Sequence, residues 1–213
     1  MKKLSLIALA SAALLAPILS HAESTTINPA IAGSAASAKL DFTVVIPAVP
    51  YLRVGTGSAI AAANNATVDS LVFTVPATNL GDSTVVAGVG GDLTAGAVTV
   101  RVFSNFGNNV SLNSSVSGQL SNGTDTIPWT QIAVASAPLA ATTAGFTNTG
   151  IAHPTFSATT GPGTAVVLAA ASRMVRQEGK WTFTYANSNA YPAGTYGSSV
   201  ANNGRVTYTA TQL

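Results

Sequence analysis

The chain contains no cysteine among its 213 residues. This absence excludes a disulfide framework, a thiolate metal site and the lipidated cysteine of a lipoprotein. Charged residues are also scarce, with 9 Lys and Arg, 7 Asp and Glu and 2 His. So few charges leave no electrostatic footprint for nucleic acid or for an anionic membrane surface, and neither is an expected partner.

Residues 1–22 have the organisation of a secretory signal peptide. Lys2 and Lys3 precede the apolar residues 4–19, and Ser20-His21-Ala22 forms a small-x-small cleavage site. The apolar stretch is short for a bilayer span, and no comparable run follows it, so we expect no membrane span. We predict cleavage after Ala22 and export to the periplasm, the cell surface or the medium. The exported chain then has seven basic and seven acidic residues and is neutral.

Residues 23–37 are small and polar, and we interpret them as a mobile N-terminal arm. Within this arm, one edge of the stretch 25–33 is mildly apolar and includes Ile27, Pro29 and Ile31. A donor strand that pairs with a neighbouring sheet has this pattern. A disordered leader without a binding role is the alternative interpretation.

Residues 38–213 show the alternation of apolar and polar residues that is typical of β-strands. The first such run places Leu40, Phe42, Val44 and Ile46 on one face. Asn, Gly, Asp and Pro clusters separate the runs, and no helical crossovers are visible between them. We therefore predict an all-β fold, a single antiparallel β-sandwich of 8–10 strands, Ig-like or pilin-like. We expect four aromatic side chains to be buried: Phe42, Trp181, Phe183 and Tyr208. The further runs lie at 51–54, 70–75, 97–103, 109–116, 128–135, 164–171, 172–176, 181–185 and 205–210.

Candidate chemistry is sparse. His153 is the only histidine after residue 22, and no nucleophile elbow accompanies it. Because Pro154 follows, we interpret it as a loop histidine whose replacement by alanine leaves folding intact. The aspartates lie mostly in turn contexts, where they cap backbone groups. We therefore predict no catalytic residue, no metal site, no cofactor and no enzymatic activity.

Charge concentrates at one place, where Arg173, Arg176, Glu178 and Lys180 lie around a predicted turn, RQEGKW. A basic hairpin tip that touches an acidic glycan or a neighbouring subunit is one interpretation. Charges that keep adjacent strands from pairing with other chains are the alternative.

The C-terminal sequence resembles that of a known class of subunits. PAGTY at 192–196 and GRVTYTA at 204–210 are similar to the penultimate and final strands of pilin-like subunits of the spore-coat-U and archaic chaperone–usher type. LSNGTDTIPW at 120–129 is similar to central motifs of uncharacterised secreted β-sandwich proteins. Those subunits usually carry cysteines, which this chain lacks. The resemblance implies partners that are further copies or other surface subunits, joined by strand addition.

Together these patterns predict an exported structural or surface-interaction protein, a subunit of a pilus-like or cell-surface assembly. A monomeric extracytoplasmic β-sandwich that binds a glycan or another ligand is the main alternative. A secreted hydrolase is the third.

The signal-peptide interpretation predicts the N-terminus of the exported protein. Edman sequencing or mass spectrometry of exported material should find that the chain begins at Glu23. Exported material that retains Met1 would contradict both the cleavage site and the compartment.

Overall fold

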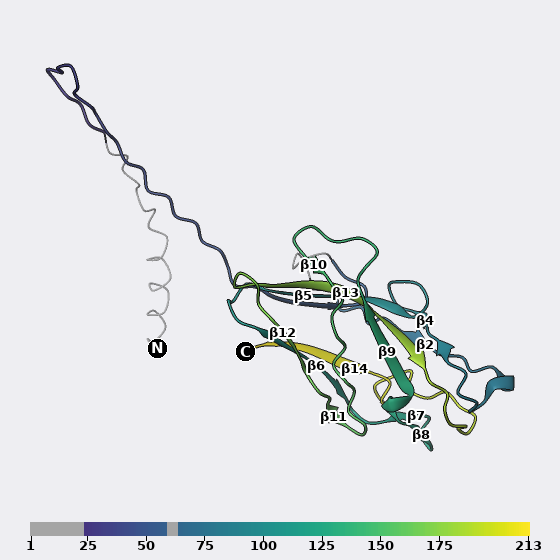
Figure 1. Cartoon of the computed structure of the whole chain (residues 1–213). Helices are drawn as coiled ribbons and strands as arrows, with labels where there is room; N and C mark the ends of the chain where they lie inside the picture. The colour runs from purple at the N-terminus through teal and green to yellow at the C-terminus, as the bar shows by residue number, and fades with distance from the viewer. Residues whose placement is uncertain (1–23, 59–63) are drawn as a thin grey trace, which may run out of the picture. The chain divides into compact units, whose positions relative to one another are not determined.

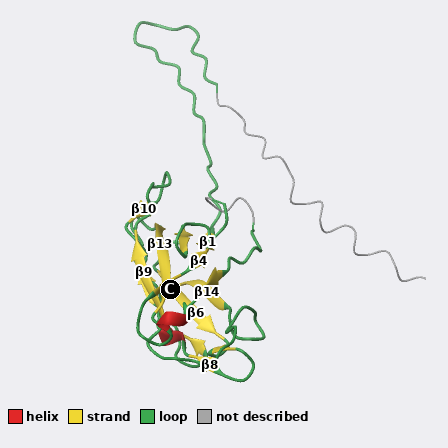
Figure 2. Cartoon of the chain, turned by 90° about the vertical axis from the view of Figure 1, so that its right-hand side faces the viewer, coloured by secondary structure: helices red, strands yellow, loops and turns green. Residues whose placement is uncertain are grey.

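The computed structural model describes residues 24–58 and 64–213, so the predicted signal peptide and its cleavage site lie outside the described residues. The chain divides into a unit that ends at Ile46 and a compact unit, Pro47–Leu213. Strands and loops make up nearly all of the described chain (Figure 2). Its helical elements are two single turns of 3-10 helix, η1 (Ala77–Asn79) and η2 (Trp129–Gln131). The protein is therefore all-β, as predicted.

The larger sheet has six strands and is built around β13 (Figure 1). On one side of β13 the order runs through β5 to β1, and on the other side lies β9. Pairing is antiparallel except for the two residues of β10, which run parallel to β13. The strands are β1 (Pro50–Val54), β3 (Val86–Ala87), β5 (Ala97–Ser104), β9 (Ile132–Ala137), β10 (Thr147–Asn148) and β13 (Val175–Tyr185).

The second sheet has four strands around β6 (Val110–Val116). The last strand of the chain, β14 (Val206–Gln212), pairs with the whole length of β6 on one side. Two short strands, β11 (Gly161–Pro162) and β12 (Val166–Leu168), pair with its other side. Two small ribbons complete the fold: β2 (Leu71–Val72) with β4 (Val89–Gly90), and β7 (Leu120–Ser121) with β8 (Thr126–Ile127).

One hydrophobic core joins the two larger sheets. Alternating residues of β5, β6 and β13 supply it, among them Val100, Leu112 and Trp181, each with 0% of its surface exposed. The Trp181 indole Nε1 donates to the Ile151 carbonyl at 2.6 Å, so its polar atom is satisfied inside the core. The period-two pattern correctly predicted that Trp181 and Phe183 are buried.

The first predicted strand is wrong. Residues 38–46 form no strand, and Phe42, which we expected in the core, is 84% exposed. Alternation shows only that a segment could cover an apolar surface, and the apolar side chains of this segment are exposed, with Leu40 at 60% and Ile46 at 76%.

The turn predicted at RQEGKW is also wrong, because β13 continues through it. The Gly and charged residues had indicated a turn. Instead, Gly179 lies where a Cβ would come within 2.7 Å of the Gly150 Cα, so a glycine lets the covering loop approach the strand. The predicted run at 70–75 is a strand only at Leu71–Val72, and the run at 128–135 begins with η2.

Buried and exposed phenylalanines give a direct test of this core. Phe183→Ala should lower the free energy of unfolding by about 3–5 kcal/mol, because it leaves a cavity beside Trp181. Phe42→Ala is the matched control. On dilute, monomeric protein it should change the free energy of unfolding by less than about 0.5 kcal/mol, since that ring is exposed within its own chain. Urea unfolding followed by tryptophan fluorescence measures both. Equal losses would show that the core is wrongly assigned.

Candidate functional site

Two strands present unpaired edges on the same side of the compact unit. Within the described part of the chain, β1 pairs only with β5, and β14 pairs only with β6. β1 and β14 approach each other but do not pair. Figure 1 shows β14 beside β6 at the side of the sheet that faces away from β12. Unpaired backbone groups of this kind are a template for an added strand.

A groove of about 590 Å³ lies along β1, and its lining includes residues 56–58, 64, 65 and 67 of the following loop and one residue of β14. Residues 49–54 of β1 and its approach form one wall, and Tyr208 of β14 forms part of the other. Leu52 and Val54 of β1 and Tyr208 and Ala210 of β14 are partly buried and pack against the core. The groove has a polar side, formed by the loop residues, and reaches the edge of the hydrophobic core at Leu52, Val54 and Tyr208, where an apolar side chain could insert.

The wall at Tyr208 is joined to His153. The His153 Nε2 and the Tyr208 hydroxyl lie 2.8 Å apart in a hydrogen bond. The imidazole packs edge-on against Trp181, with ring centroids 4.5 Å apart, and against Phe156 at 4.7 Å. Burial raises the pKa of Tyr208, so the phenol stays protonated. His153 is in a loop, as predicted. Its ring contacts Trp181 of one sheet and Tyr208 of the other, so we now expect alanine at this position to lower stability, contrary to the expectation from the sequence.

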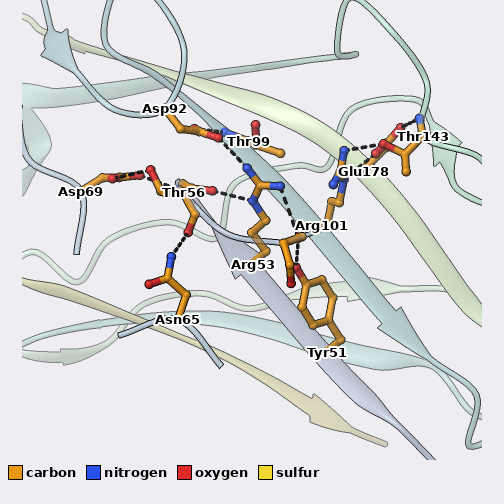
Figure 3. Close-up of polar contacts among 12 residues, drawn as sticks. Tyr51, Arg53, Thr56, Asn65, Asp69, Asp92, Thr99, Arg101, Thr143 and Glu178 are labelled. Carbon is orange, nitrogen blue, oxygen red and sulfur yellow. Dashed lines mark hydrogen bonds and ion pairs between the residues drawn. The ribbon is translucent and has the colours of Figure 1, made fainter. Parts of the chain in front are cut away.

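Figure 3 shows a polar network that fixes β1 to the rest of the compact unit. Arg53 Nη2 contacts the Asp92 carboxylate at 2.9 Å, and its Nε donates to the Gly55 carbonyl at 2.6 Å. The other Asp92 oxygen accepts from the Thr99 backbone N–H at 2.7 Å. These contacts hold the strand that forms one wall of the groove.

A second polar cluster contains a buried ion pair (Figure 3). Arg101 Nε donates to Glu178 Oε2 at 2.7 Å, and the Thr143 N–H donates to Glu178 Oε1 at 2.6 Å. Burial opposes ionisation of Glu178, but the hydrogen bonds from Thr143 and Arg101 outweigh it and hold its pKa below the usual range. Glu178 is thus an internal structural residue, and the charge cluster predicted around it is not a hairpin tip.

The remaining predicted interaction residues are dispersed. Arg173 and Arg176 are exposed, the first of them in the turn before β13, and Lys180 is half-buried further along that strand. In the N-terminal unit, the stretch that holds Pro29 is exposed, with Ile27 and Ile31 at 38% and 77%.

The strongest candidate segment is one that the sequence had assigned to the core. Leu40, Phe42, Val44 and Ile46 alternate along residues 40–46, and Val44 and Ile46 are 82% and 76% exposed. A run of large apolar side chains that is exposed in this way marks a surface for another molecule. The alternating pattern correctly identified a segment with one apolar face. The error was to place that face in the core of its own chain.

A second feature lies in the loop between β13 and β14. The Tyr191 and Tyr196 rings are half-buried, 6.4 Å apart, and the Tyr196 hydroxyl donates to the Pro192 carbonyl at 2.9 Å. Paired tyrosines in a polar loop offer an apolar surface with hydroxyl groups beside it. No sequence pattern predicted this pairing.

Comparison with protein-family models, with curated proteins and with solved structures finds no match to this chain. No helix within residues 24–58 and 64–213 is long and apolar enough to cross a membrane. Those same residues contain no group of three or more His, Asp or Glu side chains arranged to hold a metal ion.

The environment of His153 predicts a pH-dependent stability. Burial lowers the pKa of His153 from 6.5 to about 4, so the folded protein favours the neutral ring. Unfolding therefore takes up a proton as the pH falls below 6.5, and stability is lost between pH 6.5 and 4. The free energy of unfolding should fall by about 2 kcal/mol from pH 7 to pH 5. Urea unfolding at both values measures it, and His153→Phe should abolish most of the difference. An equal difference in the variant would contradict this assignment.

Proposed function

We propose that the protein is an exported structural subunit of a pilus-like or other cell-surface assembly, whose copies join by strand addition. Residues 40–46 of one copy would pair with the free edge of β14 in another. Their apolar side chains would then enter the groove between β14 and β1. The exposed, alternating segment Leu40–Ile46 is the observation that carries the proposal.

The chemistry of the donor segment matches that of the groove. An added strand gains main-chain hydrogen bonds along a free sheet edge, and alternate side chains fill pockets beneath it. Each large apolar side chain that is fully buried contributes about 1.5–3 kcal/mol before the cost of association. The segment offers four such side chains, whereas the stretch 25–33 offers only Ile27 and Ile31 with Pro29 between them.

The fold is consistent with this role. We interpret the two larger sheets as the layers of one β-sandwich of the Ig-like or pilin-like kind, in which the β1–β14 side is open. The resemblance of residues 192–210 to the final strands of pilin-like subunits supports this interpretation. The signal-like residues 1–22 support export to the place where such assemblies form.

A single charge in the donor segment tests the proposal. The purified exported chain should form oligomers at high concentration. Val44→Asp should leave monomers, because a carboxylate is costly to bury against Leu52, Val54 and Tyr208, the core side of the groove. Thr43→Asp, whose side chain lies on the opposite face, is the matched control and should still assemble. Size-exclusion chromatography with light scattering measures the mass of each, and urea unfolding checks that all three are equally folded.

Deletion of residues 23–37 distinguishes the two possible donor segments. Assembly should survive that deletion if residues 40–46 donate the strand, and loss of assembly would instead favour Ile27, Pro29 and Ile31. Monomers for the parent chain and both aspartate variants would refute assembly by strand addition.

The second candidate function is a monomeric glycan-binding protein, which the Tyr191–Tyr196 pair favours. Exposed aromatic faces bind the apolar faces of sugar rings, and the surrounding Asn and Ser residues could bind hydroxyl groups. A parent chain that stays monomeric and is retained on a polysaccharide column would support this function in place of assembly.

A further inference from the structure

The linker between the exposed segment and β1 is the three-residue sequence Pro47-Ala48-Val49, and Pro50 begins β1. It joins residues 40–46 directly to the strand that forms one wall of the groove. A three-residue connection is long enough for a β-hairpin. Each copy could therefore fold residues 40–46 back along its own β1 and fill its own groove.

The residues of this linker oppose such a hairpin. Hairpin turns use Gly, Asn or Asp at positions with positive φ, and the linker contains none of these residues. Pro47 and Pro50 fix their own φ angles, and each disfavours a helical conformation in the residue before it. Val49 is β-branched and fits an extended backbone. The linker is accordingly free of turn structure.

One side chain holds this conformation from outside. The Asn105 Nδ2 donates to the Pro47 carbonyl at 2.8 Å, and the Val49 N–H donates to the Asn105 Oδ1 at 2.7 Å. Both polar atoms of one amide are used on two backbone groups of the linker. Asn105 follows β5 directly, so the linker is fastened to the end of a central strand.

We infer that Asn105 and the two prolines form a clamp that prevents each copy from closing its own groove and so reserves residues 40–46 for another copy. This inference rests on the proposed function, since it requires that the groove accept the segment. The clamp would explain why residues 40–46 bind the groove of another copy and not the groove of their own copy. A short linker that resists folding back favours the exchange of an element between copies.

The absence of cysteine from the sequence allows a direct test. Val45 and Thr209 each lie off the apolar face of their segment. Val45→Cys therefore places one thiol on the donor segment, and Thr209→Cys places one on β14, the strand that accepts it. Neither thiol would enter the groove. A short bis-maleimide then joins the two thiols. Closure within a chain gives a cross-linked monomer, and exchange gives dimers and larger products, which a denaturing gel separates.

The double-cysteine parent should give mainly intermolecular products. Ala48→Asn with Val49→Gly installs a hairpin turn and should raise the share of cross-linked monomer by about tenfold, which corresponds to about 1.4 kcal/mol. Asn105→Ala should shift the ratio in the same direction. Asn122→Ala is the matched control and should leave the ratio unchanged. Like Asn105, Asn122 makes two side-chain hydrogen bonds to the backbone, which it accepts from the N–H groups of Thr124 and Asp125.

Urea unfolding identifies variants that lose stability, and a purely structural role for Asn105 would lower stability without changing the ratio. An unchanged ratio in folded linker and Asn105 variants would overturn the clamp and leave strand addition standing. A parent that already gives mainly cross-linked monomer would overturn it as well. A parent that gives neither product would refute the proposed function, and the clamp with it.

Discussion

Strand β13 is the element on which the compact unit depends, because other strands pair along both of its sides and it is covered on both faces. Trp181 and Phe183 fill the core on one face. On the other face, Glu178 is fully buried and is satisfied by Arg101 and Thr143. Removal of one partner from a buried pair leaves an uncompensated charge that costs about 3–5 kcal/mol. The loop that supplies Thr143 is thereby held over the sheet, and Gly179 gives it room.

Strands β6 and β14 could be predicted from the sequence, because burial of one sheet face imposes a period of two on them. That same rule misplaced Leu40–Ile46. An alternating pattern indicates that one face of a segment is suited to burial. It does not indicate whether that face is buried in the same chain or against another molecule. The turn at RQEGKW failed for another reason: a glycine that a neighbouring loop requires cannot be distinguished locally from a glycine in a turn.

The candidate site combines residues that no local pattern connects. Tyr208 lies on the last strand, Leu52 lies on the first strand of the compact unit, and His153 lies in a loop between them. Their proximity depends on how β1 and β14 come to lie on the same side of the two sheets. The roles of individual charged residues could not be predicted from the sequence either. Arg53 and Asp92, for example, are 39 positions apart, and they come into contact only because β1 lies beside the segment before β5.

One intermolecular contact would cover both the exposed apolar segment and the free sheet edge. An exposed apolar segment and a free sheet edge both promote uncontrolled association, and natural proteins usually protect edges with charges, bulges or covering loops. This chain has few charged residues that would oppose such association. Without the predicted signal peptide its net charge is zero, so copies do not repel each other strongly. Strand addition would cover the apolar face of residues 40–46, pair the edge of β14 and fill the groove beside Tyr208 in one step. A linker that cannot turn back makes another copy, and not the same one, the molecule that completes this step.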